Sequence, residues 1–246
     1  MPLLKNIAYL ATCRESGDQA KIHPIKDAAI AWDKGQIQWV GYESDLPKEY
    51  ADYEVHDASG KMVIPGLVDC HTHLAFGGWR PDEFAMRVRG ESYLDIAKSG
   101  GGILSTVKAT RAASQDALYE KVADFLDEIA QRGITTVECK SGYGLSVDNE
   151  LKLLRIYQRL ADEKSLHIVP TFLGAHTIPP EFEHDRDGYI DLVVEEMIPA
   201  VAEQGIAEFC DIFTEESAFT IEESRRILTA AKMAGLTPKL HADQLS

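Results

Sequence analysis

The sequence has few cysteines, no long hydrophobic run and little positive charge, and each absence excludes a class of protein. Its four cysteines, Cys13, Cys70, Cys139 and Cys210, lie far apart, so we expect neither a disulfide framework nor a C-x-x-C pair for metal or redox chemistry. No apolar stretch approaches the roughly 20 residues of a membrane-spanning helix, and the first residues lack the apolar core and cleavage site of a signal peptide. These absences predict a cytoplasmic chain whose thiols are reduced and buried.

The charge balance is strongly acidic. The 246 residues include 25 Lys and Arg against 40 Asp and Glu, for a formal net charge of -15, and the basic residues are dispersed along the chain. Because nucleic-acid binding needs a clustered basic surface, we expect a small-molecule substrate, and neither a nucleic acid nor a membrane as partner. The sequence is also compatible with a homodimer.

The pattern of secondary structure changes near residue 62. Before it, apolar and polar residues alternate in short strands. Residues 28–32 and 36–41 flank Asp33-Lys34-Gly35, a turn signal that predicts a β-hairpin. We therefore expect a small β-sandwich segment over residues 1–62.

From residue 63 onward, short apolar runs alternate with longer helical patterns. The runs that predict strands are residues 67–70, 135–139, 168–173, 207–213 and 238–241. The patterns that predict helices are residues 114–132, 147–164, 189–204 and 221–234. Three of the helical patterns are followed by a glycine suited to a C-cap, namely Gly133, Gly205 and Gly235. This repeated alternation predicts parallel βα units.

A His-x-His pair ends the first of these strands. His71 and His73 are two residues apart, so in a strand both imidazoles project from the same face. They lie at the C-terminal end of the strand, where barrel active sites are found. Two imidazoles on one face can chelate a divalent metal. The alternative is a chance pair in a loop, which the position at the end of an apolar strand disfavours.

His241 is the third candidate ligand, because it ends the fifth apolar run. A lone histidine at a strand end is more often structural than a metal ligand, and it is the pair upstream that favours a metal here. The sequence thus predicts one metal ion held by His71, His73 and His241.

Residues 63–73 resemble the first barrel strand of the amidohydrolase superfamily, which follows an N-terminal β-sandwich segment. Further motifs are more specific, and together they resemble the imidazolonepropionase family. These motifs are HLAFGGWR at 73–80, KSGYGL at 140–145, FLGAH at 172–176 and LHADQ at 240–244. The resemblance covers essentially the whole chain.

The resemblance implies a reaction and a cofactor. The reaction is hydrolysis of the cyclic C–N amide bond of 4-imidazolone-5-propanoate to N-formimidoyl-L-glutamate, in histidine degradation. His71, His73 and His241 would hold one divalent or trivalent metal ion, zinc or iron, that activates water.

The resemblance also implies roles around the substrate. Arg80 would bind the propanoate group, because a planar guanidinium pairs well with a carboxylate. Tyr143 and His176 would hydrogen-bond the imidazolone ring, and Gln244 would contact it beside the metal, with His176 and Gln244 as candidate catalytic residues. The alternatives are a surface ion pair of Arg80 with Asp82 or Glu83, a half-buried loop aromatic at Tyr143 and an ordinary loop histidine at His176.

The fold that the resemblance implies is a TIM-type (β/α)₈ amidohydrolase barrel over residues 63–246, truncated after about five strands. A metal-ligand aspartate after the eighth strand and a catalytic histidine after the sixth would lie beyond Ser246. Two other interpretations stay open. One is another cyclic-amide amidohydrolase, dihydroorotase-like or an aminohydrolase, and the other is a non-catalytic metal-binding fragment.

Overall fold

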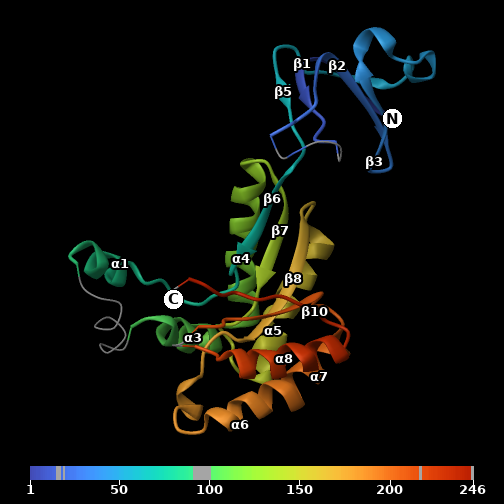
Figure 1. The fold of residues 1–246 in the computed structure, drawn as a ribbon. Coiled ribbons are helices and arrows are strands. Elements are labelled where there is room, and N and C mark those ends of the chain that lie inside the picture. Colours follow the sequence, from blue (N-terminus) through green and yellow to red (C-terminus); the bar gives the residue numbers. More distant parts are fainter. Residues whose placement is uncertain (15–17, 19, 91–100, 216–217, 245–246) are drawn as a thin grey trace. The chain divides into compact units, whose positions relative to one another are not determined.

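The structure, a computed structural model, describes residues 1–14, 18, 20–90, 101–215 and 218–244. The chain divides into two compact units, Met1–Gly66 and Leu67–Ser246. The first unit is a mixed β-sheet, and the second is a parallel β-sheet with helices packed against it (Figure 1). None of the helices within the described ranges is both long and apolar enough to cross a membrane.

The sheet of the first unit has five strands in the order β3-β2-β1-β4, and β5 also pairs with β1. Strand β2 is antiparallel to both β1 and β3, whereas β4 and β5 are parallel to β1. The strands are β1 Pro2–Ala11, β2 Pro24–Asp33, β3 Gln36–Tyr42, β4 Glu54–Asp57 and β5 Met62–Val63. Two short 3₁₀ helices follow β3, η1 Glu43–Asp45 and η2 Lys48–Tyr50.

The predicted hairpin is confirmed. Strands β2 and β3 pair as far as Asp33 opposite Gln36. The two residues between them both have positive φ, 48° at Lys34 and 76° at Gly35, as a type I′ turn requires.

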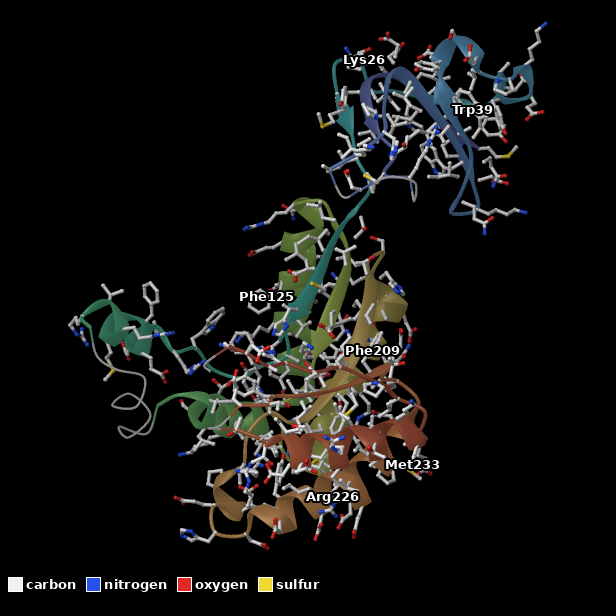
Figure 2. The ribbon with its side chains drawn as sticks, viewed as in Figure 1. Lys26, Trp39, Phe125, Phe209, Arg226 and Met233 are labelled. Carbon is white, nitrogen blue, oxygen red and sulfur yellow. The ribbon has the colours of Figure 1, made fainter. Side chains whose placement is uncertain are left out.

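Two small apolar clusters pack on this sheet. One contains Ile7 and Ala28, and the other contains Leu3 and Ala31 with Trp39 (Figure 2) packed against it. The described part of this unit holds one sheet and not two. The expected β-sandwich is therefore not confirmed.

The sheet of the second unit consists of five parallel strands in the order β10-β9-β8-β7-β6. Strands that follow one another in sequence are also neighbours in the sheet, without the reversal of order that marks a doubly wound fold. The strands are β6 Leu67–Thr72, β7 Ile134–Lys140, β8 His167–Ala175, β9 Phe209–Ile212 and β10 Thr237–Pro238. All five predicted strands are confirmed.

The last strand is shorter than its apolar run. β10 ends at Pro238, yet the next residues still bond to β9, because Lys239 N donates to Cys210 O at 2.8 Å and His241 N to Ile212 O at 3.0 Å. β6 and β10 form the two edges of the sheet, so the described strands do not close into a barrel.

Three of the predicted helices are found within one residue at each end. They are α4 Gln115–Gln131, α5 Val147–Glu163 and α8 Ile221–Met233. The fourth pattern becomes three consecutive segments, α6 Arg186–Asp191, the π-helical η4 Leu192–Met197 and α7 Ile198–Gln204. Pro199 near the start of α7 lacks an N–H for the carbonyl one turn back, which accounts for a wider turn before it.

The sequence patterns did not predict the remaining helices described in the second unit. They are α1 Pro81–Val88, α3 Ile103–Ala112 and the 3₁₀ helix η3 Pro180–Phe182. The large core of the second unit lies between the sheet and its helices, where side chains such as Leu154 and Tyr157 of α5 and Phe172 of β8 are fully buried.

The prediction that the thiols are buried holds for two of the four cysteines. Cys139 and Cys210 are buried, and burial raises the pKa of each thiol to about 12. Cys13 and Cys70 are exposed, so the prediction was wrong for them. Cys13 follows strand β1, and Cys70 lies on the edge strand β6 beside an open cavity.

The start of α8 yields a first prediction. Thr220 and Glu223 form a capping box, and Glu223 also pairs with Arg186 of α6 at 2.5 Å. The Arg186 guanidinium lowers the pKa of Glu223 from 4.5 to about 2. Because the folded-state pKa is depressed, Glu223 stabilises the fold above pH 4.5 and this contribution is lost as the pH falls toward 2.

We expect Glu223→Gln to lower the free energy of unfolding by about 1 kcal/mol at pH 6. The difference between the two proteins should shrink as the pH falls from 4.5 to 2 and should vanish below pH 2. Urea unfolding followed by helical circular dichroism at several pH values measures this. A difference that is the same at pH 6 and pH 2.5 would contradict the assigned ion pair.

Candidate functional site

Three of the predicted site residues come together at the C-terminal ends of the strands. The ring centroids of His71 and His73 are 5.8 Å apart, and those of His71 and His241 are 5.0 Å apart. His71 lies on β6, and His73 directly follows this strand. His241 follows β10 and forms an isolated β-bridge with Phe213, which directly follows β9. The strands thus bring together histidines that are 170 residues apart in sequence.

His73 is held through one ring nitrogen. Its Nδ1 lies 3.1 Å from the carbonyl oxygen of Ser141. Burial, with smaller contributions from His176 and His71, lowers the pKa of His73 to about 3. The ring is therefore neutral near pH 7, and since the carbonyl can only accept, Nδ1 carries the proton and Nε2 keeps its lone pair.

The donor chemistry fits zinc or iron. Three rings that bind one zinc ion through nitrogen at about 2.0–2.1 Å have centroids roughly 5 Å apart, close to the two separations around His71. As they stand, however, no three His, Cys, Asp or Glu side chains of the described residues are arranged to hold a metal ion. His241 Nε2 lies 2.7 Å from Gln244 Oε1, which occupies that nitrogen.

Tyr143 and His176 extend the cluster on the other side of His73. The His176 ring stacks on His73 with centroids 5.0 Å apart, and Tyr143 lies 5.3 Å from both rings. His176 Nδ1 is 2.9 Å from the carbonyl oxygen of Gly142. Burial lowers the pKa of His176 to about 4, so this ring is also neutral near pH 7. The loops after β7 and β8 thus supply ring side chains to the same place.

Arg80 lies at the N-terminus of α1 and forms an ion pair with Glu83 at 3.1 Å. This is one of the two ion pairs that the sequence offered as the alternative to substrate binding. Arg80 also lines a cavity of about 150 Å³ together with Phe76, Trp79 and Tyr143. The predicted carboxylate-binding residue therefore shares a cavity with the predicted ring-binding tyrosine.

The loop before Arg80 is held by Lys121 of α4. Its ammonium donates to the carbonyl oxygens of Phe76 and Gly78, both at 3.0 Å, and lies 3.5 Å from the centroid of the Phe76 ring. Phe125 (Figure 2) stacks on Phe76 at 6.1 Å. Cation–π contact and hydrogen bonds together fix the loop on the helix.

A cavity of about 470 Å³ opens beside His71 and His241, and charged residues that the sequence motifs did not single out also line it. Buried Lys140 of β7 pairs with Asp211 of β9 at 2.5 Å and with Glu138 at 3.2 Å. The sequence does carry a signal for these residues, because each is a charged residue inside an apolar strand. A charge is rarely buried without a partner, so such residues indicate a buried ion pair.

Proteins of known identity provide an independent comparison. No model of a known protein family matches the chain. The chain is 50% identical over 223 residues to the imidazolonepropionase of Shewanella sediminis, covering 90% of this chain and 55% of that protein. It is 44% identical over 250 residues to the imidazolonepropionase of Clostridium tetani, covering 99% and 60%. The resemblance seen in the motifs is confirmed, and the chain spans little more than half the length of these relatives, consistent with an N-terminal portion.

Solved structures show a similar fold at low sequence identity. A triazine hydrolase from Arthobacter aurescens has a TM-score of 0.65 at 15% identity, covering 99% of this chain and 53% of that one. The 5-methylcytosine deaminase from Klebsiella pneumoniae has a TM-score of 0.64 at 14% identity, covering 98% and 51%. At these identities the similarity shows the fold alone.

Proposed function

We propose that this chain is the N-terminal portion of a metal-dependent imidazolonepropionase, which hydrolyses 4-imidazolone-5-propanoate to N-formimidoyl-L-glutamate. The observation that carries the proposal is the cluster of His71, His73, His176, His241 and Tyr143 at one end of a parallel sheet. The identity of 44–50% to imidazolonepropionases supports the same reaction. A cytoplasmic location and a homodimer stay predictions.

We also propose that the second unit is part of a (β/α)₈ barrel. Five parallel strands in sequential order, joined by helices, are the arrangement of such a barrel, and its active site lies at the C-terminal ends of the strands. The clustered rings lie at that end. Similarity in fold to a triazine hydrolase and a deaminase supports this architecture.

In the proposed site, His71, His73 and His241 would hold one zinc or iron ion. When bound, such an ion lowers the pKa of water toward neutrality and polarises a carbonyl. Gln244 lies next to His241, with its Oε1 2.7 Å from His241 Nε2. The amide of Gln244 can donate to the ring carbonyl of the substrate, where negative charge develops during attack.

Tyr143 and His176 orient the imidazolone ring in this proposal. The Tyr143 hydroxyl can donate or accept a hydrogen bond. His176 has its Nδ1 on the Gly142 carbonyl, which leaves Nε2 to accept a proton or a hydrogen bond from the ring.

The direct test uses purified protein that contains this sequence, loaded with zinc or with iron. We expect loss of 4-imidazolone-5-propanoate and formation of N-formimidoyl-L-glutamate, with no turnover of dihydroorotate. Turnover of dihydroorotate alone would instead favour the dihydroorotase-like interpretation. Metal binding without turnover of either compound would favour a non-catalytic metal-binding protein.

Arg80→Ala is expected to raise KM roughly 10- to 150-fold with little change in kcat. The guanidinium contacts a carboxylate that does not react, so it binds substrate and transition state alike, and a charged hydrogen bond contributes about 1.5–3 kcal/mol. Steady-state kinetics measure the effect. The control is Arg225→Ala, because Arg225 is an exposed arginine of α8 in an i,i+3 pair with Glu222. An unchanged KM would leave Arg80 with only its ion pair to Glu83.

A further inference from the structure

A buried carboxylate lies behind the loop that carries Tyr143. Glu150, on the first turns of α5, is 0% exposed. Its oxygens accept hydrogen bonds from the backbone N–H groups of Gly142 at 3.0 Å and of Gly144 and Leu145 at 2.8 Å. The Ser141 hydroxyl is a fourth donor. A carboxylate is the side chain with enough acceptor sites for four converging donors.

The loop at residues 141–145 has little room for another conformation. Gly142 has a φ of 101°, and a Cβ there would lie 3.0 Å from His176 Nδ1 and 2.9 Å from the Leu173 carbonyl oxygen. From the other side, Arg111 of α3 donates to the carbonyl oxygens of Gly144 at 2.6 Å and Leu145 at 3.0 Å. The loop is therefore clamped through its amides by Glu150 and through its carbonyls by Arg111.

One peptide of this loop connects Glu150 to His73. The N–H of the Ser141–Gly142 peptide donates to Glu150, and the C=O of the same peptide accepts from His73 Nδ1 at 3.1 Å. The next carbonyl, that of Gly142, is 2.9 Å from His176 Nδ1. Hydrogen bonds in series polarise one another, so a carboxylate at one end strengthens the bond at the other.

We propose that Glu150 is a positioning residue that holds His73 in the Nδ1–H tautomer through the Ser141–Gly142 peptide, and His176 in the same tautomer by fixing the loop that carries the Gly142 carbonyl. Both rings then direct Nε2 away from the loop, available to a metal ion at His73 and to substrate at His176. Partners of this kind fix the tautomer and raise the basicity of a metal-binding histidine. The assignment of His73 to the metal rests on the proposed function, whereas the hydrogen-bonded chain does not.

The test is Glu150→Gln in the whole protein. An amide accepts with one oxygen only and turns an NH₂ group toward an N–H donor, so the loop must rearrange. Long-range ¹H–¹⁵N NMR of the metal-free protein reports the tautomer of each histidine. We expect the Nδ1–H form for His73 and His176 in the wild type, and a mixture for His73 in the variant. Zinc affinity should fall between 10- and 100-fold.

Two controls separate positioning from loss of stability. Glu223→Gln makes the same chemical change at a distant cap and should leave both tautomers and zinc affinity unchanged. Glu150→Asp retains the charge on a shorter side chain and should restore part of the zinc affinity. A folded Glu150→Gln protein with wild-type tautomers and wild-type zinc affinity overturns the proposal.

If Glu150→Gln does not fold, hydrogen exchange in the wild type tests whether Glu150 holds the loop amides. The amides of Gly142, Gly144 and Leu145 should exchange as slowly as those of β7, although they lie in a loop. Exchange at the rate of an exposed loop overturns the proposal. None of these measurements uses substrate, so failure to hydrolyse imidazolonepropanoate would remove the proposed function and leave the tautomer result standing.

Discussion

Replacing His73 by alanine is expected to remove most bound metal and to reduce hydrolysis of 4-imidazolone-5-propanoate by roughly a thousandfold, or about 4 kcal/mol. The effect is large because one ring serves two purposes. Its Nε2 is the expected ligand, and its faces pack beside His71 and His176, with centroids 5.8 and 5.0 Å away. Alanine deletes the ligand and leaves the neighbouring rings without their central contact.

Mass spectrometry of the purified variant gives the metal content, and initial rates give the activity. The matched control is His184→Ala, because His184 is exposed and lies outside the cluster of rings. That variant should keep both metal and turnover. If His73→Ala binds metal at the wild-type stoichiometry, His73 is not a ligand, and its role is confined to packing against His176.

The sequence predicted the part of this site that depends on local spacing. His71 and His73 project together because strand residues alternate, and the apolar run before them marks the strand. The hairpin at Lys34 and Gly35 was predictable for the same reason, because its turn chemistry is local. His241 could be placed only by assuming parallel strands, which bring strand ends to one edge of a sheet.

The buried charges were not predictable in this way. Glu150 follows two polar residues in an amphipathic helix, where a glutamate is normally solvated, and its partners are amides of a preceding loop. Lys140 and Asp211 are 71 residues apart. Only the pairing of β7, β8 and β9 brings them together, and no pattern within one strand indicates which charge faces which.

Lys140→Met is expected to lower the free energy of unfolding of the second unit by about 3–5 kcal/mol, since it leaves a buried carboxylate without its partner. Asp211 is 2% exposed. Its side-chain oxygens accept a hydrogen bond from Lys140 Nζ at 2.5 Å and one from the neighbouring backbone amide of Ile212. The substitution affects the Glu138 carboxylate less, because this carboxylate keeps its hydrogen bonds to Lys239 and to the Thr171 hydroxyl.

Urea unfolding followed by helical circular dichroism measures this loss, because the α-helices of the described chain all belong to the second unit. The double variant Lys140→Met/Asp211→Leu provides the control. It removes both charges, so it should recover much of the stability that the single variant loses. A single variant as stable as the wild type would mean that Asp211 reaches water in the folded protein.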